Sequence, residues 1–283
     1  MRDDQIRTWP AAPERRGAAL PLFLALAAAG LTVALIVVSV QAGGLDEIRS
    51  QVGLGSQAGV DEVSVSLADP AATPVVASGV EKPSITSVRL WSNGDSTSFF
   101  MSVGFFDAMV ARGAALTQPE AEYQNGSGLI TPEYFDWPAY IRTEMAEKNP
   151  NLVVFMIGAN DAKFFADPEE YRALVAEAMD LMEAPERRVI WVGQPNSSQE
   201  KLAANVPAIN TIFQEEAAKR PWVTFVDTWG VTSDDAGNYS QVLPGAEGEG
   251  VIARADDGVH LTQAGGKILA DAVMAAIGEL YAD

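Results

Sequence analysis

The chain has 283 residues, of which 48% are apolar and 8% aromatic, and this composition excludes an intrinsically disordered protein. A net charge of −19 and a pI of about 4.3 argue against nucleic acid as a partner and against electrostatic docking on anionic lipid head groups. No cysteine is present, so the chain has neither a disulfide framework nor a thiolate nucleophile.

The N-terminal sequence predicts that most of the protein lies outside the cytoplasm. Four arginines lie in residues 1–16, which we predict to be cytoplasmic, and residues 17–40 then carry no charge. A helix of that length spans a hydrocarbon core of about 30 Å, so we predict a transmembrane signal-anchor over residues 17–41. The alternative is a signal peptide cleaved after Ala42, which would make the protein secreted. The length of the apolar run favours the anchor.

Residues 42–84 are rich in glycine, serine, alanine, valine and proline and contain few aromatic residues. No hydrophobic periodicity lasts in this stretch, so we predict a linker. From residue 85 onward the pattern becomes regular, and we predict one folded domain over residues 85–283.

Apolar runs and helical periodicity alternate along this domain. Strands are predicted at residues 85–92, 151–158, 188–193 and 222–229, with a weaker candidate at 116–124. Helices are predicted at residues 98–113, 136–149, 167–183, 198–220 and 262–281, and Pro207 is expected to interrupt or kink the fourth. This alternation predicts an α/β fold, a three-layer α/β/α sandwich around a five-stranded parallel sheet.

Three polar motifs fall where predicted strands end. Ser96 follows the first strand, Asn160 follows the strand at 151–158, and the only histidine, His260, lies between the last strand and the last helix. Ligand sites in parallel sheets lie at the carboxyl ends of the strands, so we expect these loops to converge.

The residue types in these loops suit nucleophilic catalysis. A serine hydroxyl needs a base to take its proton, and His260 is the only imidazole available. Asp257, three residues earlier, is placed to orient that imidazole. Donors for an oxyanion are the backbone N–H of Ser96, a backbone N–H in the "NGSG" stretch at residues 125–128, and the amide of Asn160.

Each motif also has an ordinary structural interpretation. "NGDS" and "GAND" are turn sequences, Asn160 or Asp161 would cap a helix, and a lone histidine is more often structural than catalytic. We expect Asp95 to tie down the turn through its carboxylate. The convergence of a serine, an amide and an Asp–His pair on one edge favours a catalytic site.

The chain resembles the SGNH (GDSL-type) hydrolase superfamily over roughly residues 85–283. Four motif blocks carry the resemblance: "GDS" at 94–96, a glycine in "NGSG" at 125–128, "GAND" at 158–161 and "DGVH" at 257–260. The stretch "GSGLITPEYFDWP" is similar to a run in an uncharacterised subgroup of exported bacterial members.

The resemblance implies a flavodoxin-like sheet and a serine esterase. It implies Ser96 as the nucleophile, His260 as the base and Asp257 as the acid that orients the base. It also implies oxyanion donors from Ser96, Gly128 and Asn160. We choose Gly128 over Gly126 because it follows a serine, as in several members.

The sequence departs from the family pattern next to the nucleophile, with Asn93 before Gly94 and Thr97 after Ser96. Asn93 would either reach into the site or end the strand. These departures leave the catalytic set complete but put the substrate preference in doubt.

Several stretches near the motifs have two interpretations each. The long segment at 230–256 either shapes a pocket or is an acidic surface loop. The segment at 163–165 (Lys163, Phe164 and Phe165) would line the mouth of the site. Tyr134, Phe135 and Trp137 would either stack on a sugar or pack in the core.

The sequence therefore predicts an extracytoplasmic esterase that removes acyl, in particular acetyl, groups from a carbohydrate or cell-envelope glycoconjugate. The alternatives are an O-acyltransferase that uses the same acyl-enzyme and a catalytically silent module that binds glycan or protein. No cofactor is expected, and one histidine without cysteines gives no metal-ligand spacing.

Overall fold

The computed structural model describes residues 81–283. The predicted cytoplasmic segment at 1–16, the transmembrane segment at 17–41 and nearly all of the linker at 42–84 lie outside the described residues and stay predictions. In the part of the chain that the structure describes, no helix is both long and apolar enough to cross a membrane.

Five parallel strands form the central sheet in the spatial order β2-β1-β3-β4-β5, which confirms the predicted α/β architecture. The strands are β1 (Arg89–Gly94), β2 (Ala115–Leu116), β3 (Leu152–Met156), β4 (Arg188–Val192) and β5 (Val223–Val226). β1, β3 and β4 are almost completely buried, and the continuous apolar runs of β3 and β4 predict this for strands covered on both faces.

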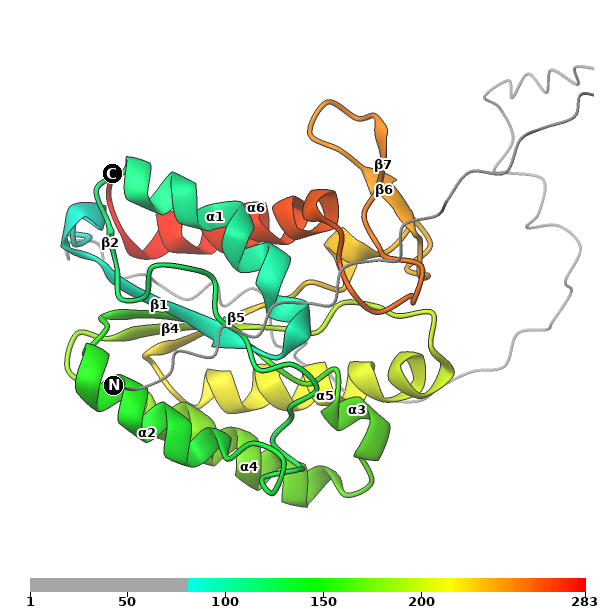
Figure 1. The fold of residues 1–283 in the computed structure, drawn as a ribbon, viewed down its shortest axis with the longest axis horizontal. Helices are drawn as coiled ribbons and strands as arrows, with labels where there is room; N and C mark the ends of the chain where they lie inside the picture. The colour runs from blue at the N-terminus through cyan, green and yellow to red at the C-terminus, as the bar shows by residue number, and fades with distance from the viewer. Residues whose placement is uncertain (1–80) are drawn as a thin grey trace, which may run out of the picture. The chain divides into compact units, whose positions relative to one another are not determined.

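Helices cover both faces of the sheet (Figure 1). One layer holds α1 (Phe99–Ala111) and α6 (Gln263–Leu280). The other layer holds α2 (Trp137–Lys148), α3 (Asp161–Phe164), α4 (Pro168–Leu181) and α5 (Glu200–Ala218).

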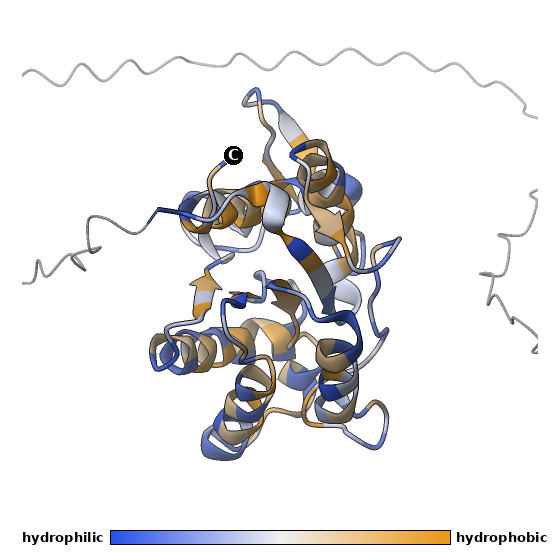
Figure 2. Ribbon diagram, turned by 90° about the vertical axis from the view of Figure 1, so that its left-hand side faces the viewer, coloured by the Kyte–Doolittle hydropathy of each residue, from blue (hydrophilic) through white to orange (hydrophobic). Residues whose placement is uncertain are grey.

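Each face of the sheet supplies one hydrophobic core. Successive strand residues alternate between the two, so Leu90 packs with α1 and α6, and Trp91 packs with the helices on the other face. Hydrophilic residues lie along the outer sides of the helices in the lower layer (Figure 2).

Short polar side chains start the helices at the predicted places. Asp136 accepts a hydrogen bond from the backbone N–H of Ala139 at the start of α2. Asp167 caps α4, and Thr262 caps α6 by accepting from Gly265 N–H. These caps satisfy backbone donors that have no partner within the helix, which is why the helices begin there.

The structure corrects three of the expected elements. α5 runs unbroken through Pro207, so the interruption that was one of the two predicted effects of this proline does not occur. The apolar side of this 19-residue helix is buried in the core, and that burial outweighs the local cost of a proline, about 3 kcal/mol. The first strand begins only at Arg89, because Ile85–Ser87 form a short 3₁₀ turn capped by Ser84.

The third correction concerns the weak strand candidate at 116–124. β2 covers only Ala115–Leu116, and a single parallel bridge joins Gln124 to Asp95 further along. Beyond β2, the side-chain amide of Gln118 donates to the carbonyl of Ser92 on β1, where a longer β2 would place a backbone donor.

The long segment at 230–256 is not an irregular loop. It contains the 3₁₀ turn Gly230–Thr232 and an antiparallel hairpin of β6 (Val242–Pro244) and β7 (Gly250–Ile252). Figure 1 shows this hairpin projecting beyond the layer of α1 and α6.

α1 and α6 approach each other closely where glycines face the partner helix. A Cβ on Gly104 would lie 2.8 Å from the Cβ of Ala270, and a Cβ on Gly266 would clash with the backbone of Phe100. The position of α6 matters for the site because the loop that carries His260 leads directly into this helix.

We therefore predict that Gly266→Ala lowers the free energy of unfolding by roughly 1–3 kcal/mol, since overpacking exceeds the gain in helix propensity. Gly278→Ala lies in the same helix with nothing within 4 Å, so it should leave stability unchanged or raise it by up to about 1 kcal/mol. Urea unfolding of both variants tests this. Equal effects of the two substitutions would show that the helix contact is not tight.

Candidate active site

Ser96 lies at the carboxyl end of β1, as predicted, and begins the 3₁₀ turn Ser96–Ser98. The strand ends at Gly94, where any Cβ would clash with the backbone carbonyl of Met156 on β3. Only glycine permits this approach of the two strands, so the turn that carries Ser96 starts right beside the end of β3. Ser96 itself is half-buried.

Asp95 fixes this turn, which confirms its predicted structural role. Its Oδ1 accepts hydrogen bonds from the backbone N–H and the hydroxyl of Thr97 at 2.9 and 2.5 Å. Its Oδ2 accepts from the backbone N–H groups of Gly158 and Ala159, both at 3.0 Å. Complete burial raises the pKa of Asp95 in spite of these bonds.

His260 and Asp257 come together with Ser96 at this edge of the sheet. The Oγ of Ser96 lies 2.8 Å from His260 Nε2, and His260 Nδ1 lies 2.5 Å from Asp257 Oδ2. The backbone N–H groups of Val259 and His260 bind Asp257 Oδ1 at 2.8 and 2.9 Å. The carboxylate thus holds both the ring and the backbone of its histidine.

The same contacts keep Asp257 ionised. Partial burial raises its pKa, but the hydrogen bonds from the His260 ring and from the two backbone N–H groups outweigh burial and lower the pKa of Asp257 to about 2. The carboxylate is therefore ionised, and able to stabilise an imidazolium, at every pH at which a histidine can act as a base.

A tight turn positions this pair. Gly258 has a φ of +71°, a conformation that side chains disfavour, and a Cβ there would clash with Ser198. The carbonyl of Gly258 accepts from the hydroxyl of Ser197 at 2.9 Å and from Ser198 N–H at 3.1 Å. The loop after β4 therefore supports the histidine loop.

Asn160 is buried at the end of the loop after β3, close to the "NGSG" stretch. Its Nδ2 donates to the carbonyl of Ser127 at 2.9 Å, and its Oδ1 accepts from Lys163 Nζ at 2.8 Å. The lysine therefore fixes which end of the amide presents its N–H groups, because an ammonium only donates.

The structure places the two candidate glycines differently. Gly128 is buried, and a Cβ there would clash with the carboxylate of Asp161. Its N–H points away from Asn160, because that amide binds the carbonyl of the same trans peptide. Gly126 is exposed at a φ of +74°. The choice of Gly128 over Gly126 as an oxyanion donor stays a prediction.

Asp161 is a second buried carboxylate below these loops. It accepts from Ile130 N–H at 2.9 Å and from the hydroxyl of Tyr171 at 3.0 Å. Burial raises the pKa of Asp161 to about 6, and hydrogen bonds from Ile130, Leu129 and Tyr171 offset this only in part. Asp161 thus anchors the backbone directly after the "NGSG" stretch rather than simply capping a helix.

The aromatic candidates divide between core and surface. Trp137 is fully buried and donates from its indole N–H to Ser127 Oγ at 3.0 Å, so it packs in the core. Phe135 packs edge-on against it. Tyr134 is 64% exposed and donates to the carbonyl of Asn125. Of the mouth candidates, Phe164 is 58% exposed.

The two residues that depart from the family pattern point into the protein. Asn93 is buried within β1, one residue before the strand ends, and donates to the Tyr140 hydroxyl at 3.3 Å, so its side chain neither ends the strand nor reaches into the site. Thr97 is buried and donates to Asp95 and to Gln194 Oε1.

Sequence reasoning missed two buried side chains around the site. Gln194, at the end of β4, supports Thr97. Arg254 is completely buried, donates to the carbonyl of Asn196 and faces the ring of Tyr239 at 5.7 Å. No local sequence pattern distinguishes either from an ordinary loop residue. Within residues 81–283 no cluster of three or more histidine, aspartate or glutamate side chains is placed to hold a metal ion.

Comparison with known proteins supports the fold. Residues 89–276 match a family model described as "Protein of unknown function (DUF459)". The chain matches no curated protein.

Several solved structures have a similar fold. A carbohydrate esterase family 3 protein from Talaromyces cellulolyticus superposes with a TM-score of 0.51 at 18% identity, covering 68% of this chain and 97% of that one. A lipase/acylhydrolase from Enterococcus faecalis gives a TM-score of 0.53 at 18% identity, with 69% and 98% covered. A GDSL-like lipase from Bacteroides thetaiotaomicron gives 0.50 at 17% identity, with 71% and 92% covered. These similarities confirm the predicted SGNH hydrolase fold.

The raised pKa of Asp161 predicts a pH-dependent stability. Between about pH 4 and pH 6 the folded state keeps a proton on Asp161 that the unfolded chain has released. This contribution is complete below the unfolded pKa and is lost as the pH rises through about 6, a loss of roughly 3 kcal/mol.

Asp161→Asn should remove this loss of stability. The free energy of unfolding of the variant should therefore rise relative to that of the wild type between pH 4 and pH 7. Urea unfolding across this range measures the difference. Asp107→Asn, at an exposed aspartate on α1, is the control and should follow the wild-type curve. Parallel curves for Asp161→Asn and wild type would contradict the prediction.

Proposed function

Because the chain belongs to the DUF459 family and has the fold of SGNH hydrolases, we propose that it is a serine esterase. It would remove acyl groups, in particular acetyl, from a carbohydrate or cell-envelope glycoconjugate. The observation that carries this proposal is the chain of contacts from Ser96 Oγ through His260 to Asp257, at 2.8 and 2.5 Å. A silent binding module has no need for such a chain.

In the first step, His260 Nε2 takes the proton of Ser96 Oγ while the oxygen attacks the ester carbonyl carbon. The tetrahedral intermediate collapses, the sugar oxygen leaves with the proton from His260, and an acyl group remains on Ser96. Water then attacks the acyl-enzyme with His260 as the base, and His260 returns the proton to Ser96 Oγ as the carboxylic acid leaves. Asp257 stabilises the imidazolium in both halves of the reaction.

The backbone N–H of Ser96 and one N–H of Asn160 are the proposed donors to the oxyanion. The family resemblance implies Gly128 as the third, and its N–H would have to turn toward Asn160 to serve. Asp95 and Asn160 belong to one hydrogen-bonded loop system, so these donors are held before substrate arrives. Preorganised donors of this kind each contribute about 10²–10³ in kcat.

The cellular location of the enzyme and the molecule that accepts the acyl group also belong to this proposal. The uncharged run at 17–40 supports a membrane-anchored enzyme with its catalytic domain outside the cytoplasm, or a secreted one if the chain is cleaved after Ala42. A sugar hydroxyl in place of water would turn the same acyl-enzyme into a transferase.

The first test replaces the proposed catalytic residues in the full chain. Wild type should hydrolyse p-nitrophenyl acetate and release acetate from peracetylated glucose, and a fluorophosphonate should label Ser96. Ser96→Ala and His260→Ala should each lower kcat by at least about 10³-fold, because nucleophile and base act as a unit.

Ser87→Ala is the matched control, since it changes an exposed serine that precedes β1, at the opposite end of the strand. Circular dichroism confirms that each variant is folded. Undiminished turnover in folded Ser96→Ala would refute the mechanism.

A second prediction concerns Lys163. Its ammonium holds Asn160 Oδ1 and places a positive charge behind a donor to the proposed oxyanion. Lys163→Met should remove that charge and leave the amide held only by the Ser127 carbonyl, so kcat should fall about 10-fold, or about 1.4 kcal/mol, with KM little changed. Steady-state kinetics on p-nitrophenyl acetate measure both constants.

Lys163→Arg keeps the charge and the donor, so it should retain more activity than the methionine variant. Lys201→Met, at an exposed position near the start of α5, is the control for loss of a lysine. A rise in KM at constant kcat would assign Lys163 to substrate binding instead.

A further inference from the structure

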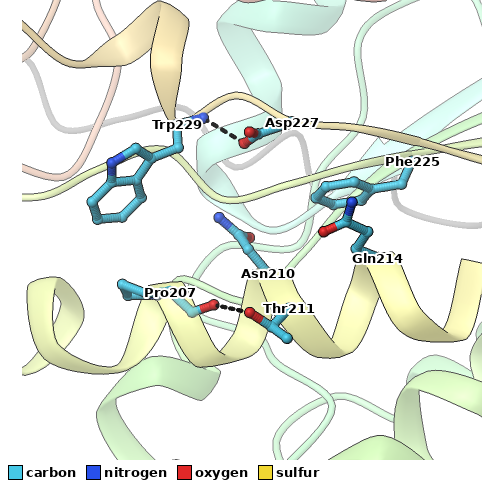
Figure 3. A pocket seen from close by; sticks show the side chains of 7 residues that line it. All are labelled: Pro207, Asn210, Thr211, Gln214, Phe225, Asp227 and Trp229. Atoms are coloured by element: carbon cyan, nitrogen blue, oxygen red, sulfur yellow. Dashed lines mark hydrogen bonds between the residues drawn. The ribbon is translucent and has the colours of Figure 1, made fainter. Parts of the chain in front are cut away.

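A cavity lies beside β5, the outer strand of the sheet, and none of the residues that line it belongs to the Ser96 site. It has a volume of about 400 Å³ and opens between α5 and the segment that follows β5. Its lining residues are Pro207, Asn210, Thr211, Gln214, Phe225, Asp227 and Trp229. Figure 3 shows Phe225, Asp227 and Trp229 on one side and the α5 side chains on the other.

The chemistry of this pocket selects an uncharged, hydroxyl-rich ligand. Phe225 and Trp229 pack partly against the core, but both are only half-buried and both line the pocket, so the exposed part of each ring is open to the apolar face of a sugar. Asp227 Oδ1 accepts from Trp229 N–H at 2.9 Å, while its Oδ2 and the amide of Gln214 have no partner among the described residues. These groups are acceptors and donors for hydroxyls.

Other ligand classes fit less well. No lysine, arginine or histidine lines the pocket, and Asp227 would repel a phosphate or carboxylate. A lipid chain would cover Asp227 and Gln214 without offering either a hydrogen-bond partner. The side chain of Asn210 is fully engaged, with Oδ1 accepting from Gln194 N–H and Nδ2 donating to Gln194 carbonyl, both at 2.8 Å, so the floor of the pocket is fixed.

The pocket lies on the same edge of the sheet as the catalytic serine. β5 is separated from β1 by β3 and β4, so the carboxyl ends of β1 and β5 lie three strand spacings apart, or ~14 Å. A glycan of a few sugar units covers that distance. Gln194 touches both regions, because its backbone is held by Asn210 and its side chain accepts from Thr97, next to Ser96.

We infer that this pocket is a remote sugar subsite, which binds an unacylated unit of a glycan whose acylated unit lies at Ser96. The inference rests on the proposed esterase function. It assigns the substrate to oligosaccharides and polysaccharides rather than to single acylated sugars. Binding energy from this subsite would then raise the enzyme's preference for longer chains.

The test titrates the full chain carrying Ser96→Ala with xylotetraose, cellotetraose and tetra-N-acetylchitotetraose, followed by calorimetry. At least one of them should bind saturably, and Trp229→Ala should weaken that binding at least 10-fold. Trp229→Phe keeps an aromatic face and should retain most of the affinity. Asp227→Asn and Gln214→Ala change exposed polar groups and serve if Trp229→Ala does not fold.

Hydrolysis of p-nitrophenyl acetate separates this inference from the proposed function. Trp229→Ala in an otherwise wild-type chain should hydrolyse this small ester at the wild-type rate, whereas Ser96→Ala should bind glycan without turnover. The inference is overturned if no tetrasaccharide binds, if binding ignores every pocket variant, or if only choline, a cation that suits aromatic rings and a carboxylate, binds there.

Discussion

The carboxylate of Asp95 is the contact on which the candidate site depends. It directly precedes Ser96, and its Oδ2 binds the N–H of Ala159, which directly precedes Asn160. One buried side chain therefore sets the position of both the nucleophile and the amide donor relative to the ends of β1 and β3. An unpaired carboxylate at that depth would be costly, so its full set of hydrogen bonds makes the arrangement rigid.

The charges around the site differ according to how deeply each carboxylate is buried. Asp95 and Asp161 are both buried near groups proposed to stabilise a developing negative charge, and burial raises the pKa of both. Lys163 supplies a positive charge to the exposed side of the same loop. Asp257 differs from the buried pair, because its side chain is 44% exposed and its hydrogen bonds lower its pKa. Environment thus separates two structural carboxyls from one that is matched to a histidine.

The sequence predicts the sheet and the convergence of the motifs because both depend on local signals. Continuous apolar runs mark β3 and β4, a shorter apolar stretch marks β1, and parallel order brings the strand ends together. The element boundaries that the sequence does not predict depend on tertiary packing. α5 continues through Pro207, and β2 is limited to Ala115–Leu116. The four-residue α3 and the hairpin of β6 and β7 are too short for periodicity to reveal.

The glycine donor is the part of the site that the sequence determines least, for a physical reason. A glycine matters there through the direction of one N–H, which depends on the peptide plane and not on any side chain. The Asn160 side chain donates to the carbonyl of Ser127. In the same trans peptide the N–H of Gly128 therefore points away from the Asn160 amide. The conformation of the "NGSG" loop is set by Asp161 and Trp137, two side chains that come from later in the chain. The pattern of catalytic side chains is therefore readable from spacing, whereas the backbone donors that complete the site depend on contacts that only the folded chain makes.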